Sequence, residues 1–420
     1  MTIDITQRSE RFLLILTLGA LTTLGPMAID LYLPALPAIA SDMGEPLHKI
    51  QFTLSAYTVG FALGQLIYGP LSDRFGRQKV MLPGIIFYML TSLLAATCTN
   101  ANQLIMVRIL QAMAGAAIMV TIPAMVRDLF PREESAKALS SILMVMTVAP
   151  LVAPILGGQI LKFWGWQTLF LFLAGIAVLG FILALSRISE TLPLEKRSRT
   201  SGGELVWNYL DILKNREAMG CILCHGFFFG GMFAFISGSP FIYIELFGVK
   251  PENYGLLFSL NIISMAIMNM VNMRLIGRLQ LFTILKTGSV IAAVASLTLL
   301  FNAKTGFGGL FGIVLPVMAF VACMGLTGPN SNALALAHFP KTAGTANALA
   351  GALRFSIGGL SSVAVGFLQD GTAMSMALVM AGCGLLSVSS LLLTRNQGVT
   401  AEELTELTGS GNPVNRGASA

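Results

Sequence analysis

Residues 69–79 read GPLSDRFGRQK, a polar segment between two runs of apolar residues. The segment combines two glycines, which permit tight turns, with three bases and a single acid. These residues are Gly69, Gly76, Arg74, Arg77, Lys79 and Asp73. An acid beside a helix amino terminus, or beside Arg127 at the end of a later apolar run, is stabilised by the helix dipole or by pairing. The spacing therefore predicts a structured loop that latches two parts of the molecule, rather than a generic basic loop.

The two apolar runs beside this loop belong to a series of twelve. The chain has 420 residues, of which 55% are hydrophobic and 11% charged, whereas soluble domains carry about 25% charged residues. Each run is long enough to cross a bilayer, which takes about 20 residues. The runs cover roughly residues 12–35, 51–70, 80–98, 102–126, 138–161, 166–187, 216–243, 253–273, 281–302, 307–331, 342–369 and 373–394. The sequence thus predicts an all-α membrane protein with twelve transmembrane helices, the first of them a retained helix rather than a signal peptide.

Basic residues are distributed unevenly over the connecting segments. If the amino terminus lies inside, 20 of the 26 Lys and Arg residues fall in inside segments. Arg108 and Arg354 fall within apolar runs, and the outside loops hold the other four: Lys49, Lys162, Lys250 and Lys304. This asymmetry follows the positive-inside rule and predicts that both termini are cytoplasmic. The net charge of +6 therefore reflects topology and does not indicate a nucleic-acid partner.

The polar segment 188–215 divides the chain into two halves of six runs each. We expect a six-helix half over 1–187, a cytoplasmic linker over 188–215, a second six-helix half over 216–394 and a disordered cytoplasmic tail over 395–420. The loop after the eighth run, MRLIGRLQ at 273–280, is a weaker copy of the loop after the second. Duplicated halves with a substrate site between them, near the middle of the membrane, are a known transporter design.

Two ionisable residues interrupt the apolar runs of the first half. Asp30 lies in FLLILTLGALTTLGPMAIDLYLP (12–34), and Arg108 lies with Gln111 in LIMVRILQAMAGAA (104–117). From the predicted run ends, Asp30 lies about 6 Å and Arg108 about 9 Å from the outer side, so we expect them at similar depth. A lone carboxylate in hydrocarbon favours its neutral form, which suits a group that binds and releases protons. Two interpretations remain open: a static ion pair that braces the bundle, and a proton or substrate site.

Polar residues elsewhere in the apolar runs supply further candidates. The candidate substrate-binding residues are Asp30, Tyr57, Gln65, Arg108, Gln111 and Asn261. Each uncharged member is equally explained as a helix–helix hydrogen bond. The small residues of AGTANALAGALRFSIGG (343–359) predict close packing of the eleventh helix, with the second helix as partner through Gly60 and Gly64.

Three other features of the second half have simpler explanations. Arg354 is interpreted as a brace on the cytoplasmic side, and Glu245 as a solvated acid at the outer mouth. Phe227, Phe228 and Phe229 are expected to pack or face lipid rather than to form an aromatic substrate cage. Neither Arg354 nor Glu245 is assigned a part in transport.

The motif APLVAPILGG (149–158) marks the fifth run. Pro150 and Pro154 each remove a backbone donor and bend the helix. Gly157 and Gly158 permit close contact with a neighbouring helix. An ordinary kinked membrane helix would also explain the pattern.

Cofactor, metal and nucleotide chemistry find little support in the sequence. The five cysteines, Cys98, Cys221, Cys224, Cys323 and Cys383, all lie in apolar stretches and are interpreted as small buried hydrophobes. Residues 221–225, CILCH, match the pattern for covalent haem attachment, but they lie at the inner end of the seventh run. A membrane redox protein remains a remote alternative. The phosphate-binding motif of ATP-driven transporters is absent from the sequence, and neither a cofactor nor a metal is expected.

Several segments together carry a family resemblance. They are IDLYLPALPAIA (29–40), LSAYTVGFALGQLIYGPLSDRFGR (54–77), VRDLFPREE (126–134), APLVAPILGG (149–158), GSPFIYIELFGVKPENYG (238–255) and AGTANALAGALRFSIG (343–358). The loop at 69–79 resembles the signature of the major facilitator superfamily, the standard example of duplicated transporter halves. The segments from both halves resemble the bicyclomycin-resistance family of bacterial drug/proton antiporters.

This resemblance implies roles for individual residues. The 69–79 loop, through Asp73, Arg74 and Arg77, would latch the two halves on the cytoplasmic side. Arg108 and Gln111 match a pattern in which Ala112 replaces the usual glycine. The 149–158 segment would be the fifth-helix motif of exporters, with its leading glycines replaced in part by Thr147 and Ala149.

The resemblance also implies a function. It suggests a monomer in the bacterial inner membrane that exports drugs such as bicyclomycin-like compounds, sulfonamides or phenicols in exchange for protons. The alternative within transport is a proton-linked carrier, for uptake or export, of a small metabolite such as cysteine or a dipeptide. The halves would rock about a site at Asp30, with Arg108 responding to its charge.

Overall fold

A computed structural model describes residues 8–197, 202–340 and 342–394. These residues form helices and, apart from one isolated bridge between Ile276 and Leu279, no β-structure. Twelve helical segments are long and apolar enough to cross a membrane, which confirms the predicted all-α fold with twelve spans. The predicted tail at 395–420 lies outside the described residues.

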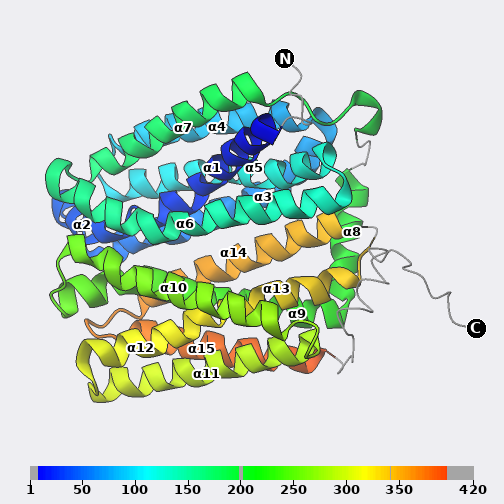
Figure 1. The fold of residues 1–420 in the computed structure, drawn as a ribbon. Coiled ribbons are helices and arrows are strands. Elements are labelled where there is room, and N and C mark those ends of the chain that lie inside the picture. The colour runs from blue at the N-terminus through cyan, green and yellow to red at the C-terminus, as the bar shows by residue number, and fades with distance from the viewer. Residues whose placement is uncertain (1–7, 198–201, 341, 395–420) are drawn as a thin grey trace, which may run out of the picture.

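The first six spans lie together on one side of the molecule in Figure 1, and the last six lie on the other. The first six are α1 (Arg8–Asp30) continued by η1 (Leu33–Ala35) and α2 (Leu36–Met43), α3 (Leu47–Phe75), α4 (Arg77–Ala95), α5 (Ala101–Leu129), α6 (Arg132–Trp164) and α7 (Gln167–Arg187). Between the halves come η2 (Leu194–Lys196) and α8 (Gly202–Lys214). The last six are α9 (Arg216–Pro240) with the π-helical η3 (Phe241–Leu246), α10 (Pro251–Leu275), α11 (Leu281–Thr305), α12 (Gly309–Ala322) with α13 (Met324–Ala337), α14 (Ala343–Phe367), and α15 (Met374–Ser390) with η4 (Leu391–Leu393).

The two ends of the bundle carry different features. One end holds the 69–79 loop and helix α8, and we call it the linker end. The opposite end holds α2, and we call it the α2 end. The positive-inside distribution predicts that the linker end is cytoplasmic.

The first span is broken where the sequence predicts a continuous helix. Helix α1 ends at Asp30, and Pro34 and Pro37 lie in the η1 and α2 segments that follow. Because proline lacks an amide donor, the chain re-forms a helix in a new segment instead of continuing the old one. The span therefore runs to Met43 rather than to residue 35, and Asp30 lies at the break.

The packing of α3 differs from the prediction for Gly60 and Gly64. Both glycines face α5: a Cβ on Gly60 would meet the Ile109 backbone, and one on Gly64 would meet Ala116. Helix α14 does pack against α3, as predicted, but through its own glycines. A Cβ on Gly359 would lie 2.6 Å from the Thr58 hydroxyl, so this small residue lets the helices approach.

The two halves touch closely near the α2 end. Here α6 meets α10, since a Cβ on Gly158 would lie 2.7 Å from the Pro251 carbonyl oxygen. Lys162 forms an ion pair of 3.4 Å with Glu252 across the same boundary. The Gln51 amide donates to the Ser237 carbonyl at 3.0 Å. These contacts close the molecule at the α2 end, whereas α6 and α10 diverge toward the linker end in Figure 1.

Candidate functional site

A central cavity of about 250 Å³ lies between the two halves. Helices of both halves contribute to its wall, which is almost entirely apolar. Five methionines and six phenylalanines dominate it: Met119, Met146, Met232, Met265, Met324, Phe61, Phe229, Phe233, Phe235, Phe258 and Phe355. The polar members of the wall are Asp30, Tyr57 and Asn261. Such a cavity suits an apolar, partly aromatic molecule with a few hydrogen-bonding groups.

Asp30 is the acid of this cavity. Its side chain projects from the end of α1 and is 5% exposed. Its carboxylate forms no hydrogen bond or ion pair with any described residue. Burial of a charged carboxylate without a partner is costly, so the site is suited to binding a proton or a cationic or hydrogen-bonding ligand.

Arg108 is fully buried beside the cavity but does not line it. Its guanidinium donates to the Gln111 side-chain oxygen at 2.7 Å and to the Ala28 carbonyl at 2.8 Å. Its terminal carbon lies 4.4 Å from the ring centre of Tyr57 and 5.0 Å from that of Tyr32. Contacts between a cation and aromatic faces partly replace the missing hydration of the guanidinium.

The structure forms no ion pair between Arg108 and Asp30, so the static-pair interpretation is wrong for this conformation. Arg108 nevertheless reaches α1 at Ala28, two residues from Asp30, as the depth argument predicts. The Tyr57 ring lies against the Arg108 guanidinium and lines the cavity together with Asp30, and its hydroxyl donates to the Gly25 carbonyl at 3.2 Å. Tyr57 therefore connects the buried cation to the cavity acid.

The remaining polar candidates divide into two groups. Asn261 lines the cavity, where its side-chain oxygen has no partner. Gln111 lies behind the wall, accepting from Arg108 and donating to the Ser92 hydroxyl at 2.7 Å. Gln65 also lies outside the wall and packs over Gly351 of α14.

The expectation that the phenylalanines at 227–229 pack or face lipid is wrong for one of them. Phe228 packs on Phe320 with ring centres 4.7 Å apart, as a core residue would. Phe229, however, lines the cavity. The methionines of the wall also escaped the sequence analysis, because an apolar residue in a membrane span looks the same whether it faces lipid, core or cavity.

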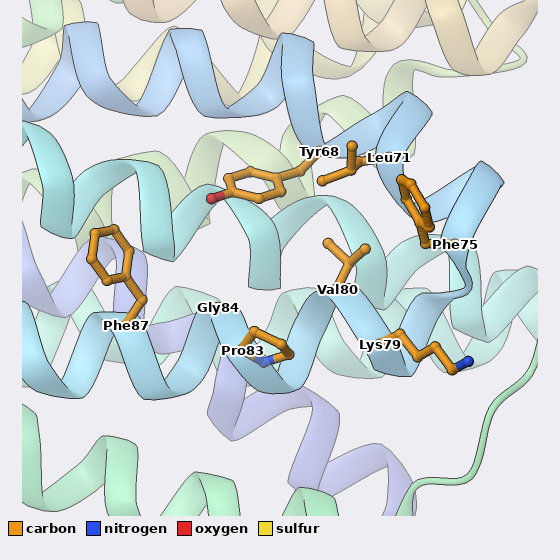
Figure 2. Close-up of a pocket in the computed structure, with 8 residues that line it drawn as sticks. All are labelled: Tyr68, Leu71, Phe75, Lys79, Val80, Pro83, Gly84 and Phe87. Atoms are coloured by element: carbon orange, nitrogen blue, oxygen red, sulfur yellow. The ribbon is translucent and has the colours of Figure 1, made fainter.

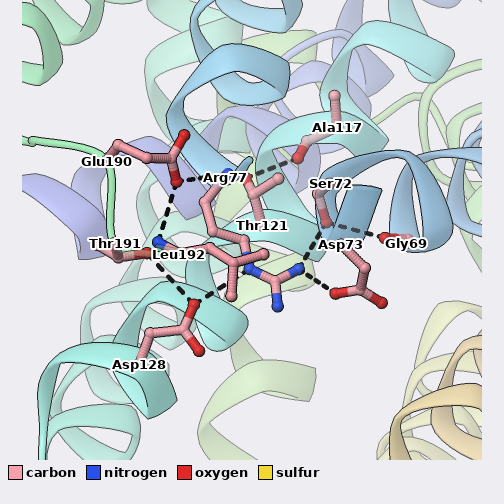
Figure 3. Close-up of polar contacts among 10 residues, drawn as sticks. All are labelled: Gly69, Ser72, Asp73, Arg77, Ala117, Thr121, Asp128, Glu190, Thr191 and Leu192. Atoms are coloured by element: carbon pink, nitrogen blue, oxygen red, sulfur yellow. Dashed lines mark hydrogen bonds and ion pairs between the residues drawn. The ribbon is translucent and has the colours of Figure 1, made fainter. Parts of the chain in front are cut away.

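The predicted loop at 69–79 is in fact the end of α3 and the start of α4, with only Gly76 between the helices. Charged contacts organise this segment, for which we keep the name 69–79 loop, around Arg77 (Figure 3). The Arg77 guanidinium binds the carboxylates of Asp73 and Asp128, the latter at 3.1 Å, and donates to the Ser72 hydroxyl at 2.8 Å. The Arg77 backbone amide donates to Glu190 at 2.8 Å. Glu190 stands where the linker begins, so the loop ties together α3, α4, α5 and the linker.

The partner of Asp73 is thus Arg77, four residues later, rather than the suggested Arg127. Arg127 forms no ion pair within the described part of the chain, and Arg74 lies over the Phe75 ring at 5.5 Å. Sequence reasoning missed Asp128 and Glu190, because only the fold brings them to the loop. Gly76 has φ +109°, a conformation that glycine adopts readily, which explains its place between α3 and α4.

The fifth-run motif lies in α6, where it contacts the first span and α10. Pro150 lines the cavity. A Cβ on Gly157 would collide with the Leu31 carbonyl, and the Gly255 position of α10 abuts the backbone of Pro154 and Ile155. The predicted close helix contact at Gly157 and Gly158 is present.

A larger but shallow groove of about 490 Å³ lies between α3 and α4 (Figure 2). Tyr68, Leu71, Phe75, Lys79, Val80, Pro83, Gly84 and Phe87 line it. It contains no acid and none of the candidate substrate residues. We therefore assign the functional site to the smaller central cavity.

The haem-attachment pattern at 221–225 lies within α9. Both thiols and the His225 ring are buried. The Cys224 sulfur lies 3.1 Å from the Ser289 hydroxyl. Haem attachment needs thiols that a cofactor can reach, so the structure argues against the redox alternative. The other three cysteines are also buried, and all five are free thiols.

Comparison with known proteins agrees with this architecture. The family model of the Major Facilitator Superfamily matches residues 18–363. A bicyclomycin resistance protein homolog of Haemophilus influenzae is 33% identical over 392 residues, covering 93% of this chain and 98% of that protein. The chain belongs to the bicyclomycin-resistance family of the major facilitator superfamily.

The chain is also similar to a second relative and to a solved transporter structure. Multidrug resistance protein D of Escherichia coli is 31% identical over 393 residues, covering 91% of this chain and 95% of that protein. The crystal structure of a D-xylose-proton symporter matches with a TM-score of 0.71 at 14% identity, covering 93% of this chain and 99% of that one, which supports the fold. The chain is therefore a multi-pass transporter of the bacterial inner membrane, not an enzyme.

Proposed function

We propose that this transporter exports small drugs from the cytoplasm in exchange for protons. One observation carries the proposal: a single unpartnered acid, Asp30, faces an apolar cavity of methionine and phenylalanine between the two halves. The names of its relatives, a bicyclomycin resistance homolog and a multidrug resistance protein, favour drug export over other cargo.

The cavity wall supports a broad substrate range. Methionine side chains are flexible and polarizable, so they adapt to molecules of different shape. Phenylalanine rings stack on aromatic groups. Moderately polar drugs such as bicyclomycin-like compounds, sulfonamides and phenicols would place a hydrogen-bonding group near Asp30, Tyr57 or Asn261.

Drug and proton compete for Asp30, and this competition would couple drug export to proton entry. A proton entering from outside neutralises the carboxylate and weakens its interaction with the drug, which then leaves. Tyr57 and Arg108 would respond to the change in charge, because Tyr57 packs on Arg108 and shares the cavity wall with Asp30. The segments 1–187 and 216–394 would rock as two bodies joined by the linker 188–215, with the termini in the cytoplasm.

The test uses purified protein in liposomes with a pH-sensitive dye. When a candidate drug is added on the side of the linker end, the drug should cross to the other side while protons cross toward the linker end. The dye should report a pH change that scales with drug uptake. Drug uptake at the same rate without any pH change would overturn proton coupling. A proton-linked uptake carrier for cysteine or a dipeptide is separated from the exporter by the direction in which cells accumulate labelled substrate.

The loop around Arg77 is proposed as the latch of the linker end, with Gly69, Asp73, Arg74, Gly76, Arg77 and Arg127 as its predicted members. The variant Arg77→Gln should slow transport by about fivefold or more, a coupling free energy of roughly 1 kcal/mol, because it leaves the carboxylates of Asp73 and Asp128 without their shared cation. Initial rates in liposomes measure the effect. Arg278→Gln is the matched control, since Arg278 is an exposed arginine that does not belong to the predicted latch. Equal rates for the two variants would refute the latch.

A further inference from the structure

A layer of aromatic rings lines the central cavity on its linker side. Phe61 of α3 and Phe355 of α14 have ring centres 4.5 Å apart, which joins the two halves. Phe229 of α9 lies 5.1 Å from Phe355. All three rings belong to the cavity wall.

One helical turn beyond this layer, the same helices carry polar side chains. Gln65 follows Phe61 by four residues in α3, which runs toward the linker end. His225 precedes Phe229 by four residues in α9, which runs away from the linker end. Residues four apart lie on one helix face, so both side chains lie on the linker side of the rings. Arg354 precedes Phe355 in α14.

Several polar atoms of these three side chains have no hydrogen-bond partner among the described residues. His225 is 3% exposed, and neither of its ring nitrogens has such a partner. The Nε of Arg354 and the side-chain oxygen of Gln65 are buried and also unpaired. Most buried polar groups in proteins are hydrogen-bonded, so unpaired atoms on three side chains on the linker side of the same rings are suited to a ligand.

Gln65 and His225 are each connected to α14, the helix that carries Arg354. Arg354 is near enough to the His225 ring for its charge to act on the protonated form of that ring. Gln65 packs over Gly351, one turn before Arg354, and a Cβ on Gly328 of α13 would lie 3.2 Å from the His225 ring. No described carboxylate forms an ion pair with Arg354. The guanidinium is thus a positive charge inside the bundle with no counter-charge.

We propose that Arg354, His225 and Gln65 form an anion subsite beneath the aromatic layer, which binds a carboxylate or similar small oxyanion. A buried charge demands a partner of opposite sign, and the planar guanidinium matches a carboxylate with two donors. His225 and the Gln65 amide supply further N–H donors. The anion is the acidic group of a larger transported molecule or a free small anion from the cytoplasm.

The experiment measures binding to the purified full-length protein without a proton gradient. Sodium benzoate, acetate and phosphate are titrated at constant ionic strength against a chloride baseline, and the midpoint of thermal unfolding is followed. A saturable increase is expected for wild type and for Arg278→Gln, whose exposed arginine serves as the matched control. The increase should vanish in Arg354→Gln, and His225→Phe should weaken apparent affinity by about tenfold.

The outcomes separate the sources of the anion. An increase with benzoate alone identifies the acidic group of a larger molecule, and an increase with acetate or phosphate identifies a free small anion. If Arg354→Gln does not fold, Arg354→Lys should retain weaker binding because it keeps the charge. No saturable increase in wild type, or an equal increase in Arg354→Gln, overturns the subsite. Asp30→Asn should still bind the anion, so failure of proton coupling and failure of the subsite are distinguishable.

Discussion

Asp30→Asn is expected to abolish drug-triggered proton movement and to hold drug affinity, at every pH, near the weaker value of the protonated wild-type protein. Asparagine has nearly the shape of a neutral aspartic acid, so the cavity wall keeps its form. It cannot bind or release a proton, so drug and proton no longer compete. Coupling energies between linked sites are typically 1–3 kcal/mol, or about 5–150-fold in affinity. We expect a change of that size in the pH dependence of drug affinity and a loss of uphill export.

The matched control for this variant is Glu245→Gln. Glu245 is an exposed acid in η3, at the α2 end, and does not line the cavity. Dye-reported proton flux and counterflow of labelled drug in the same liposomes separate coupling from binding. Asp30→Asn should lose the first and keep the second, whereas Glu245→Gln should keep both. Normal proton flux in Asp30→Asn would refute the assigned role.

Arg108→Ala is expected to be the most destabilising substitution near the site. It leaves the oxygens of Gln111 and Ala28 without their donor and removes a cation from between the rings of Tyr32 and Tyr57. A buried polar group that loses its partner costs about 1–3 kcal/mol. We therefore expect a lower unfolding midpoint and a reduced yield of folded protein, measured by thermal unfolding in detergent.

Arg108→Lys separates the charge from the shape of the guanidinium. An ammonium keeps the charge but cannot donate in a planar fork to two acceptors while stacking on aromatic faces. Its stability should fall between wild type and Arg108→Ala. Arg278→Ala, at an exposed position, should match wild type. If Arg108→Ala were as stable as Arg278→Ala, the guanidinium contacts would contribute nothing measurable.

Much of the fold was predictable, because a membrane restricts what a chain can do. A span must satisfy its backbone hydrogen bonds internally, so each apolar run of sufficient length becomes a helix. The resemblance of the 69–79 loop likewise indicated the superfamily, and segments from both halves indicated the family. The sequence did not predict the break after Asp30, because the prolines at 34 and 37 are compatible with a kinked helix, with the end of a helix or with the start of a new one.

The charged residues of the site were predictable, because charges are scarce in membrane-spanning runs. Asp30 and Arg108 stand out as ionisable residues in apolar runs, and the structure brings them near the same cavity. The cavity wall was not predictable in this way. Met119, Met265 and Phe229 resemble dozens of other apolar residues until the helices are placed around a common space.

The sequence by itself determined the twelve spans, the duplicated arrangement of loops and the presence of rare charges in hydrocarbon, since each follows from local composition and the thickness of a membrane. Only the tertiary structure decided which residues meet. It brought Asp128 and Glu190 to Arg77, turned Gly60 toward α5, and placed Asp30 and Arg354 where no described residue forms an ion pair with them. These outcomes depend on the rotation and crossing of helices distant in the chain, which no local pattern encodes.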